Sequence, residues 1–359
     1  MIGKPKIIII DDSLLVRNIL SDVLEKKAGF EVIATGKTGL DGVELAEKLK
    51  PDFIILDIEM PVMDGLTALA EIKKRKLNSA VIMLSVLTQH GADATFKALE
   101  LGAIDFVSKP SSGNQFSPDQ IADVISQKIR GFLDSRSNPR IFGHPQASTV
   151  TSLREIPNKS FQKQDSINAI AIGTSTGGPK ALQTLFSAFP NDFLRPILVV
   201  QHMPPGFTKA FADRLNSLSK VKVKEAEQGD IIEPGNAYIA PGDFQMRVVA
   251  KNGYKMIDLQ QSQTVNGHRP SIEVLFDSMA EVYGPNHLLS VIMTGMGRDG
   301  AQSITNIHSK GGITLAQDEP SSVVYGMNRA AVEMGGIDHI LPVEEIVPKM
   351  IELLRARGN

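Results

Sequence analysis

The sequence predicts two doubly wound α/β domains, each built on a parallel sheet, with a polar linker between them. A chain of 359 residues is longer than the roughly 250–300 residues at which a single hydrophobic core stops growing. Short apolar runs alternate with amphipathic stretches on both sides of one polar segment, and this alternation is typical of parallel sheets covered by helices. The expected boundaries are residues 1–130 for the first domain, 131–166 for the linker and 167–356 for the second domain.

Five apolar runs in the first domain predict the strands of its sheet. They are rich in Ile, Val and Leu, as expected of strands that are buried on both faces. The stretches 14–27 and 40–49 carry apolar residues three or four positions apart, which predicts amphipathic helices between the strands. The predicted strands are 7–10, 32–34, 53–56, 81–84 and 104–107.

Residues 135–165 break this pattern, because they are rich in Ser, Asn, Gln and Pro and lack apolar periodicity. Such a composition predicts a linker that is flexible or loosely docked. Its five basic and two acidic residues are scattered, which argues against a nucleic-acid-binding tail.

The α/β pattern resumes at residue 168 and predicts a second doubly wound domain. Residues 221–265 are richer in turns, such as those at Gly229, Gly235 and Gly242, and predict a small antiparallel extension of the parallel core. The predicted core strands are 169–172, 197–200, 237–240, 288–293 and 313–316, and the predicted helices are 179–188, 271–283, 301–309 and 321–333.

The composition narrows the classes of function. A formal net charge of −2 gives no support for a general nucleic-acid role. Because the chain contains no cysteine, disulfides, thiolate metal sites and a cysteine nucleophile are excluded. No apolar run approaches the ~20 residues that span a bilayer, and the first run is too short for a secretory signal. We therefore expect a cytoplasmic enzyme. We also expect it to be a monomer.

Polar side chains follow four of the predicted strands in the first domain. Asp11 and Asp12 follow the first strand, Asp57 the third, Ser85 the fourth and Lys109 the fifth. Because ligands of open α/β sheets bind at the carboxyl ends of the strands, these side chains should converge on one edge. Taken singly, Asp12 is explained equally well as the N-cap of the following helix.

Three carboxylates at one edge repel one another unless a cation lies between them. Hard oxygen ligands with open positions favour Mg²⁺, which would also orient an incoming phosphoryl group. One aspartate would then be the nucleophile that forms an acyl phosphate. Lys109 would pair with a phosphoryl oxygen, and Ser85 would donate a hydrogen bond to it.

Residues 1–130 resemble the receiver domains of response regulators, which have a flavodoxin-like fold. The resemblance rests on the Asp11–Asp12 pair, Asp57 in LDIEMPVMDG, Ser85 in MLS and Lys109 in VSKP. It implies that a partner histidine kinase phosphorylates Asp57 with Mg²⁺ as cofactor. It also implies that Mg²⁺ is held by Asp11, Asp12 and Asp57, and that the switch residues are Ser85, Phe106 and Lys109. Phe106 stands where many receivers have tyrosine, so a phenol hydrogen bond is absent here.

A second candidate site lies where the predicted strand 169–172 runs into GTSTGGP at residues 173–179. The segment matches the G-x-S-x-G pattern between a strand and a helix, which would expose Ser175 on a sharp turn. The first N–H groups of the helix would face developing negative charge. The patterns of a phosphate loop and of a dinucleotide loop are both missing. A turn rich in Ser and Gly, without chemistry, remains the alternative for this motif alone.

A nucleophilic serine needs a base, and His202 is the best placed of five histidines in the second domain. It follows the apolar run of PILVVQH, beside the Ser175 turn, although a capping or buried structural histidine is the alternative. His268, in the loop NGHRPS, is a lesser candidate. Asp299 follows the strand in LLSVIM and would orient the imidazole. Ser175, His202 and Asp299 thus each follow a core strand at the same edge.

The order Ser, His, Asp differs from that of the α/β-hydrolases, and the motifs resemble those of the chemotaxis protein-glutamate methylesterases. The segments that carry this resemblance are GTSTGGPKAL, VVQHMPPGFTKAFADRLN, AYIAPGDFQM, NGHRPSIEVLF, MTGMGRDGA and VVYGMNRAAVEMGG. The resemblance implies a Rossmann-like domain that hydrolyses γ-glutamyl methyl esters on chemoreceptors and deamidates particular receptor glutamines. It implies no cofactor for this chemistry, and contact with the membrane only through the receptors.

In this interpretation Ser175 attacks the ester, His202 is the general base, and Asp299 fixes the imidazole tautomer. The backbone N–H groups of Met296, first, and Thr176, second, are the candidates for holding the oxyanion. We also expect the unphosphorylated receiver to pack over the esterase edge, and phosphorylation to loosen it through the linker.

Two other classes of function stay open at this point. A response regulator that binds DNA would usually carry a compact helix-turn-helix with a basic face, whereas residues 168–356 are long, α/β-patterned and not markedly basic. A catalytically inactive scaffold would share the architecture, although the complete Ser, His and Asp set disfavours it.

Overall fold

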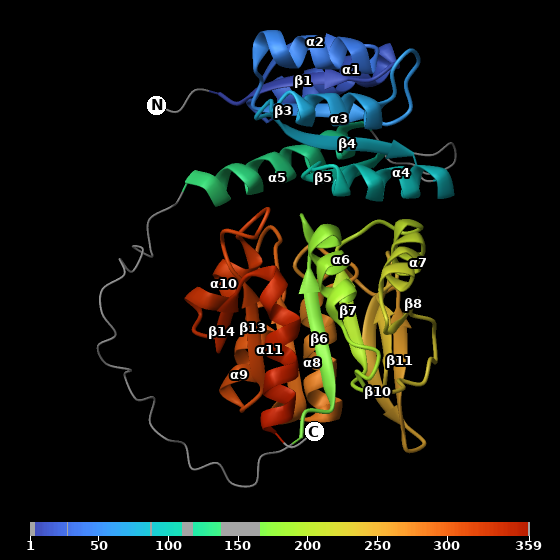
Figure 1. Cartoon of the computed structure of the whole chain (residues 1–359), viewed down its shortest axis with the longest axis vertical. Helices are drawn as coiled ribbons and strands as arrows, with labels where there is room; N and C mark the ends of the chain where they lie inside the picture. Colours follow the sequence, from blue (N-terminus) through green and yellow to red (C-terminus); the bar gives the residue numbers. More distant parts are fainter. Residues whose placement is uncertain (1–3, 27, 87, 110–117, 138–165, 358–359) are drawn as a thin grey trace, which may run out of the picture.

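Two α/β units, one above the other, make up the protein (Figure 1). The computed structural model describes residues 4–357 except 27, 87, 110–117 and 138–165. We refer to residues 4–137 as the N-terminal domain and to residues 166–357 as the C-terminal domain. None of the helices in these ranges combines the length and hydropathy needed to cross a bilayer.

The N-terminal domain is a five-stranded parallel sheet in the order β2-β1-β3-β4-β5, with helices on both faces. This confirms the doubly wound prediction, and the order is that of flavodoxin-like folds. Its strands are β1 (Lys6–Ile10), β2 (Glu31–Gly36), β3 (Phe53–Asp57), β4 (Ala80–Val86) and β5 (Asp105–Lys109), and its helices are α1 (Leu14–Lys26), α2 (Gly39–Leu49), α3 (Gly65–Lys74), α4 (Gln89–Glu100) and α5 (Pro118–Ser137).

Local sequence signals begin several of these helices. Thr38 and Asp41 form a reciprocal capping box at α2, and Asp64 caps α3 through the backbone N–H of Thr67. Helix α5 continues to Ser137, beyond residue 130, where the sequence analysis placed the start of the linker. Most of the predicted linker, residues 138–165, lies outside the described residues.

The C-terminal domain contains a seven-stranded parallel sheet in the order β14-β13-β12-β6-β7-β9-β8. A two-stranded antiparallel sheet, β10-β11, stands beside it. The strands are β6 (Ala169–Thr174), β7 (Ile197–Gln201), β8 (Lys222–Glu225), β9 (Asn236–Ile239), β10 (Gln245–Lys251), β11 (Tyr254–Gln260), β12 (Leu288–Ile292), β13 (Ile313–Gln317) and β14 (His339–Leu341). The helices are α6 (Gly178–Ala188), α7 (Phe207–Leu218), α8 (Ile272–Tyr283), α9 (Ala301–Ser309), α10 (Met327–Glu333), α11 (Val343–Ala356) and the short 3₁₀ turn η1 (Pro285–His287).

Two details of the C-terminal domain differ from the sequence expectation. Within 221–265, β8 and β9 join the parallel sheet, so the antiparallel extension is limited to β10 and β11. The helix predicted from residue 321 begins instead at Met327. Ser321 and Ser322 bond to Asp318 through their hydroxyls, and such local bonds compete with helix formation.

The strand order brings three chain segments together at one edge of the larger sheet. Strand β7 lies next to β6 on one side, whereas β12 and then β13 lie on the other side of β6. The order therefore reverses between β6 and β12. In open α/β sheets such a reversal leaves a crevice at the carboxyl ends of the strands, where ligands bind.

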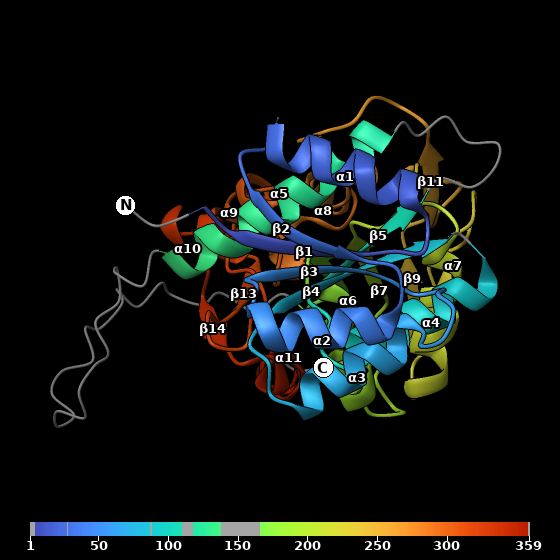
Figure 2. The same ribbon diagram turned by 90° about the horizontal axis from the view of Figure 1, so that it is seen from above.

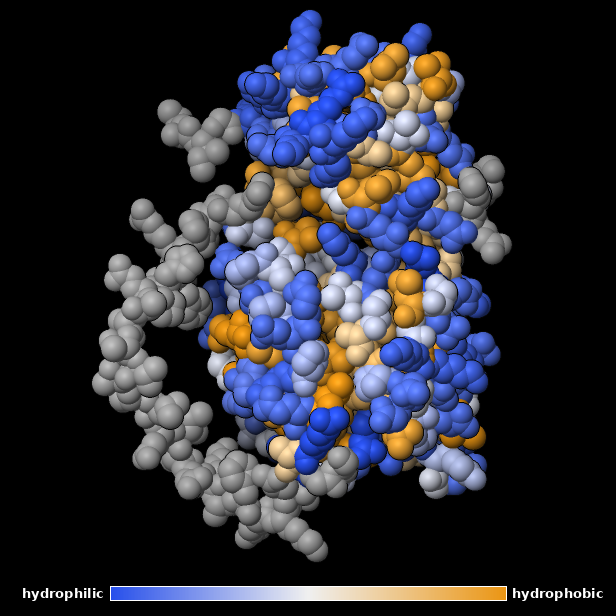
Figure 3. All heavy atoms as spheres, viewed as in Figure 1, coloured by the Kyte–Doolittle hydropathy of each residue, from blue (hydrophilic) through white to orange (hydrophobic). Residues whose placement is uncertain are grey.

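The N-terminal domain lies over this carboxyl edge, as both views show (Figures 1 and 2). Phe96 of α4 packs on Phe211 of α7 with ring centroids 5.2 Å apart, and Phe106 of β5 packs on Phe207 at 4.8 Å. One continuous apolar cluster includes side chains of both domains. Apolar atoms also gather along the boundary in the space-filling view (Figure 3). The contact between the domains is therefore largely hydrophobic.

Candidate functional site

Ser175 lies on a tight turn between β6 and α6, close to the crevice. Its backbone N–H donates to the carbonyl of Thr294, which follows β12, at 3.0 Å. Gly177 adopts a positive φ of 78° at the start of α6, a conformation that favours glycine. A Cβ atom at Gly295 would lie 2.8 Å from Ser175 Cβ, so only glycine lets this neighbouring loop approach the serine so closely.

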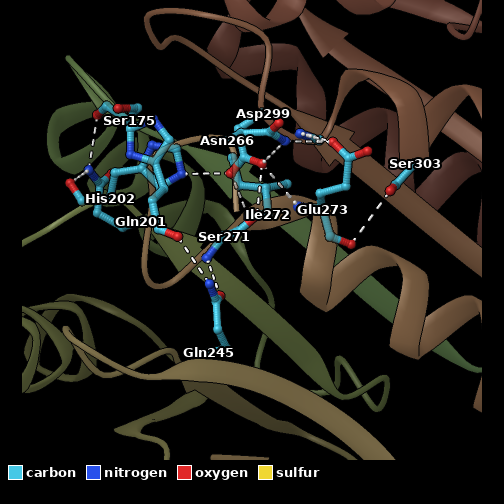
Figure 4. A network of polar contacts seen from close by, with 12 residues as sticks. Ser175, Gln201, His202, Gln245, Asn266, Ser271, Ile272, Glu273, Asp299 and Ser303 are labelled. Carbon is cyan, nitrogen blue, oxygen red and sulfur yellow. Dashed lines mark hydrogen bonds and ion pairs between the residues drawn. The ribbon is translucent and has the colours of Figure 1, made fainter. Parts of the chain in front are cut away.

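His202 and Asp299 meet across the same edge (Figure 4). His202 follows β7, Asp299 lies in the loop after β12, and the distance from His202 Nε2 to Asp299 Oδ2 is 2.9 Å. Because β12, β6 and β7 are adjacent in the sheet, the two side chains flank the Ser175 turn. The three residues predicted from their strand ends are therefore brought to one place.

Asp299 is held as an ionised carboxylate at the N-terminus of α8. It accepts hydrogen bonds from Asn266 Nδ2 at 2.9 Å, Ser271 Oγ at 2.8 Å and the Ile272 backbone N–H at 2.7 Å. Burial alone would raise the pKa of this carboxyl, but the bond and charge of His202, together with these donors, lower it to about 2. The helix N-terminus adds favourable positive potential. A charged orienting group is thus available at neutral pH.

The imidazole of His202 presents its other nitrogen, Nδ1, away from Asp299. Nδ1 is buried and has no hydrogen-bond partner among the described residues. The ring stacks on His268 with centroids 3.7 Å apart and planes 11° apart. Burial, and then the nearby His202, lower the pKa of His268 to about 4, so His268 is a neutral support for the ring. In the usual Ser-His-Asp arrangement the aspartate binds Nδ1, whereas here it binds Nε2.

Ser175 Oγ forms no hydrogen bond to His202 within the described part of the chain. This does not disqualify His202 as a base, because such bonds are often long without substrate. Thr176 and Met296, the two candidates for the oxyanion, line the same cavity of about 370 Å³ as Ser175 and His202. Met296 also faces α5, where any side chain at Gly131 would collide with the methionine sulfur.

Gln201 joins the Ser175 segment to the His202 segment. Its side-chain Nε2 donates to the backbone carbonyls of Ser175 and His202, both at 3.0 Å, and the residue is buried. Gln201 was not predicted from the sequence, although its place directly before His202 is a signal that could identify it. The donors to Asp299 were not predicted either, because the segment NGHRPS indicated only His268 as a candidate.

The N-terminal domain has its own cluster of charged side chains at the reversal between β1 and β3. Asp11, Asp12 and Asp57 have carboxylate oxygens within 4.8 Å of one another, which fits a hard cation such as Mg²⁺. Lys109 Nζ lies 2.7 Å from both Asp11 and Asp57. Burial raises the pKa of Asp57 to about 6, although the charge of Lys109 opposes this shift.

The two remaining predicted switch residues point toward other partners. Ser85 Oγ accepts a hydrogen bond from Thr95 Oγ1 at 2.8 Å and lies 3.2 Å from the Gly91 carbonyl, so it is engaged with α4. Phe106 is buried against Phe207 of the C-terminal domain. Of the three predicted switch residues, Lys109 therefore contacts the aspartate cluster and Phe106 contacts the C-terminal domain.

Comparisons with known proteins agree with this architecture. The family described as CheB methylesterase matches residues 170–350, and the response regulator receiver domain family matches residues 7–118. A protein-glutamate methylesterase/protein-glutamine glutaminase of Pyrococcus horikoshii is 44% identical over 99% of this chain and 96% of its own length. A protein of the same name from Thermotoga maritima is 39% identical over 97% of this chain and 98% of its own.

A solved structure is similar to the C-terminal domain. It is the crystal structure of the Thermotoga maritima CheB methylesterase catalytic domain, 43% identical, with a TM-score of 0.51. The match covers 53% of this chain and 100% of the solved one. The similarity therefore extends over the whole of that catalytic domain.

Replacing Gln201 with Met should lower the turnover number for ester hydrolysis by about tenfold to a hundredfold, because a misplaced base and nucleophile lose rate steeply. The substitution keeps the length of the side chain but removes both hydrogen bonds. Gln183→Met is the matched control, since Gln183 is buried and its Nε2 has no partner in the described structure. Equal turnover numbers for the two variants would contradict the role of Gln201.

The depressed pKa of Asp299 predicts a specific dependence of stability on pH. An unfolded aspartate has a pKa of about 3.9, so the stability that the carboxylate contributes is present above pH ~4 and is lost as pH falls through about 2. Asp299→Asn should therefore lose less stability than the unaltered C-terminal domain between pH 4 and pH 2, measured by thermal unfolding. Identical losses in the two proteins would contradict the prediction.

Proposed function

Because the chain belongs to the CheB methylesterase family and carries a receiver domain before its methylesterase domain, we propose that it hydrolyses γ-glutamyl methyl esters of chemoreceptors under the control of phosphorylation. The relatives' names include glutaminase, and deamidation of receptor glutamines is part of the proposal. The observation that carries it is the His202–Asp299 pair beside Ser175 at the carboxyl edge of the sheet.

The proposed reaction is acyl transfer through Ser175. The hydroxyl gives its proton to Nδ1 of His202 while Oγ attacks the ester carbonyl. The backbone N–H groups of Met296 and Thr176 would hold the oxyanion. The tetrahedral intermediate then releases methanol, which takes the proton from His202, and leaves an acyl-serine. Water, activated by the same imidazole, releases glutamate. With a glutamine side chain, the leaving group is ammonia.

The role of Asp299 in this mechanism is electrostatic. The carboxylate accepts the Nε2 proton of His202, which leaves Nδ1 as the basic nitrogen. When Nδ1 takes up the serine proton, the ionised carboxylate stabilises the imidazolium. Its three further donors keep it charged and fixed in place. Asp299 thereby serves the reaction without changing its own protonation.

In the receiver domain, Asp57 is the proposed phosphoryl acceptor, with a histidine kinase as donor. Asp11, Asp12 and Asp57 would hold Mg²⁺, which supplies charge neutralisation for the phosphoryl oxygens when bound. Lys109 already lies between Asp11 and Asp57, and it would pair with a phosphoryl oxygen instead.

The same switch positions suggest how phosphorylation reaches the esterase. The receiver packs β5, α4 and α5 over the edge that carries Ser175. Ser85 would leave its partners on α4 to bond the phosphoryl group, and Phe106 would shift relative to Phe207. Loss of this aromatic contact would weaken the docked state and expose the triad to receptors.

Ser175→Ala should reduce methanol release from methylated receptor by at least about 1,000-fold, because removal of a catalytic nucleophile abolishes the covalent path. Ser187→Ala on the exposed side of α6 is the matched control. Both variants should still accept phosphate at Asp57. Methanol release by Ser175→Ala at the rate of the control would refute the assignment of the nucleophile.

The interdomain ion pair offers a test of the docked state. Glu100 of α4 and Arg214 of α7 lie 2.6 Å apart and are both partly exposed, and such pairs contribute about 0–1 kcal/mol. Arg214→Glu should therefore raise the activity of the unphosphorylated enzyme about twofold to fivefold, as domain docking weakens.

The charge swap and a truncation complete this test. Adding Glu100→Arg to Arg214→Glu should return the activity toward the original level. Removal of residues 1–140 should give the highest activity that loss of docking can produce. If the truncated protein is less active than the full unphosphorylated chain, the receiver activates by positive contacts and the inhibitory proposal is wrong.

A further inference from the structure

The docked receiver covers the triad without filling the space in front of it. A cavity of about 370 Å³ remains between the domains and opens to solvent at its rim. On the catalytic side it is bounded by Ser175, Thr176, His202 and Met296, and on the receiver side by Phe106, Val107, Val124 and Lys128. The volume lies within the range of about 300–1,000 Å³ typical of small-molecule sites.

The catalytic groups remain available in this docked arrangement. The bond between His202 and Asp299 is formed, and no described residue occupies Nδ1 of His202. The two receiver cations on the cavity wall are already paired, Lys128 with Asp105 and Lys109 with the aspartate cluster. The receiver therefore contributes no group that engages the base.

Size then separates two kinds of ester. A glutamyl ester carried on a helical protein surface brings with it a body about 10–12 Å across. Receiver side chains such as Val124 and Lys128 form one wall of the cavity that Ser175 lines, and they stand where that body would have to lie. A single esterified amino acid brings no such body into the cavity.

We propose that the docked, unphosphorylated enzyme hydrolyses small carboxylic methyl esters, and that phosphorylation is needed only for esters carried on a folded protein. The inference rests on the proposed Ser175 mechanism. In this proposal the receiver selects substrates by size. Ser175, His202 and Asp299 can hydrolyse an ester in both the unphosphorylated and the phosphorylated enzyme.

The lining points to a neutral acyl group as the preferred small substrate. Arg269 is paired with Asp243, and Lys128 with Asp105, so neither cation is left to bind a free carboxylate. Phe106, Val107 and other apolar side chains supply much of the remaining wall. The reaction is the one already described: one water is consumed, the ester C–O bond breaks, and the free acid and methanol are released.

The test compares two substrates with the full chain, before and after treatment with a small phosphodonor and Mg²⁺. The small substrate is N-acetylglutamic acid α-amide γ-methyl ester, and the large one is methylated receptor. We expect phosphorylation to change kcat/KM for the small ester by less than about threefold while it raises that for receptor by more than about tenfold, a difference of at least about threefold, or about 0.7 kcal/mol. Equal stimulation of the two reactions by phosphorylation would overturn the proposal. Failure of the enzyme to hydrolyse the small ester, whether phosphorylated or not, would overturn it too.

A cavity-filling variant tests the route directly. Val124 lies half-buried on α5 at the cavity wall. Val124→Trp should lower small-ester hydrolysis by the unphosphorylated enzyme about tenfold, and phosphorylation should restore it. Val124→Ala is the control and should leave the rate at or above the original. An unchanged rate in Val124→Trp, with receptor hydrolysis still repressed, would contradict the proposal.

Ser175→Ala separates this inference from the proposed function. If that variant still hydrolyses either ester, the catalytic assignment fails. If it hydrolyses neither, but the small-ester rate of the unaltered chain rises with phosphorylation as much as the receptor rate does, only the size filter fails. If Val124→Trp disrupts the docking of the receiver, its hydrolysis of methylated receptor will rise without phosphodonor. In that case the comparison of the two substrates with the unaltered chain decides whether the proposal holds.

Discussion

The geometry of the catalytic face depends on the hydrogen bond between His202 Nε2 and Asp299. Asp299 stays ionised inside the protein because the N-terminus of α8 and two side chains, Asn266 and Ser271, surround it with donors. Because the carboxylate binds Nε2, Nδ1 is the imidazole nitrogen that the proposed mechanism assigns to the Ser175 proton. The bond also joins the segments that follow β7 and β12, and the Ser175 turn lies between them. A change at this contact would therefore affect the tautomer of His202, the positions of the two loops and the position of the imidazole together.

The edge that receives the substrate in the proposed mechanism is also the edge against which the receiver packs. The docked contact includes paired aromatic rings, such as Phe96 with Phe211, and the partly exposed ion pair of Glu100 and Arg214. A regulatory coupling typically amounts to about 1–3 kcal/mol. A change of that size in the free energy of docking is enough to change the fraction of molecules in which the receiver is undocked. Phe106, a proposed switch residue, is part of this contact. In the proposed regulation, that dual position would give phosphorylation a short physical path to the catalytic edge.

Much of the fold and of both candidate sites could be predicted because strand ends are encoded locally. Apolar runs mark the strands, and the polar residue that ends each run must lie at the carboxyl edge of a parallel sheet. Ser175 and His202 were located in this way. Gln201 and Asn266 were not, because their roles come from side-chain bonds to segments far away in the sequence. Which nitrogen of His202, Nδ1 or Nε2, binds Asp299 also depends on such distant contacts and was not predicted. The late start of α10 at Met327 reflects serine hydroxyls competing for the backbone, which apolar periodicity does not reveal.

The most direct measurement of the central claim is the protonation pattern of the His202 imidazole in the catalytic domain. Nitrogen NMR of histidine-labelled protein distinguishes the two tautomers of a neutral ring, which are otherwise inferred from hydrogen bonding. The structure predicts a proton on Nε2, directed to Asp299, and an unprotonated Nδ1. This preference should weaken in Asp299→Asn. A proton on Nδ1 in the unaltered domain would contradict the account.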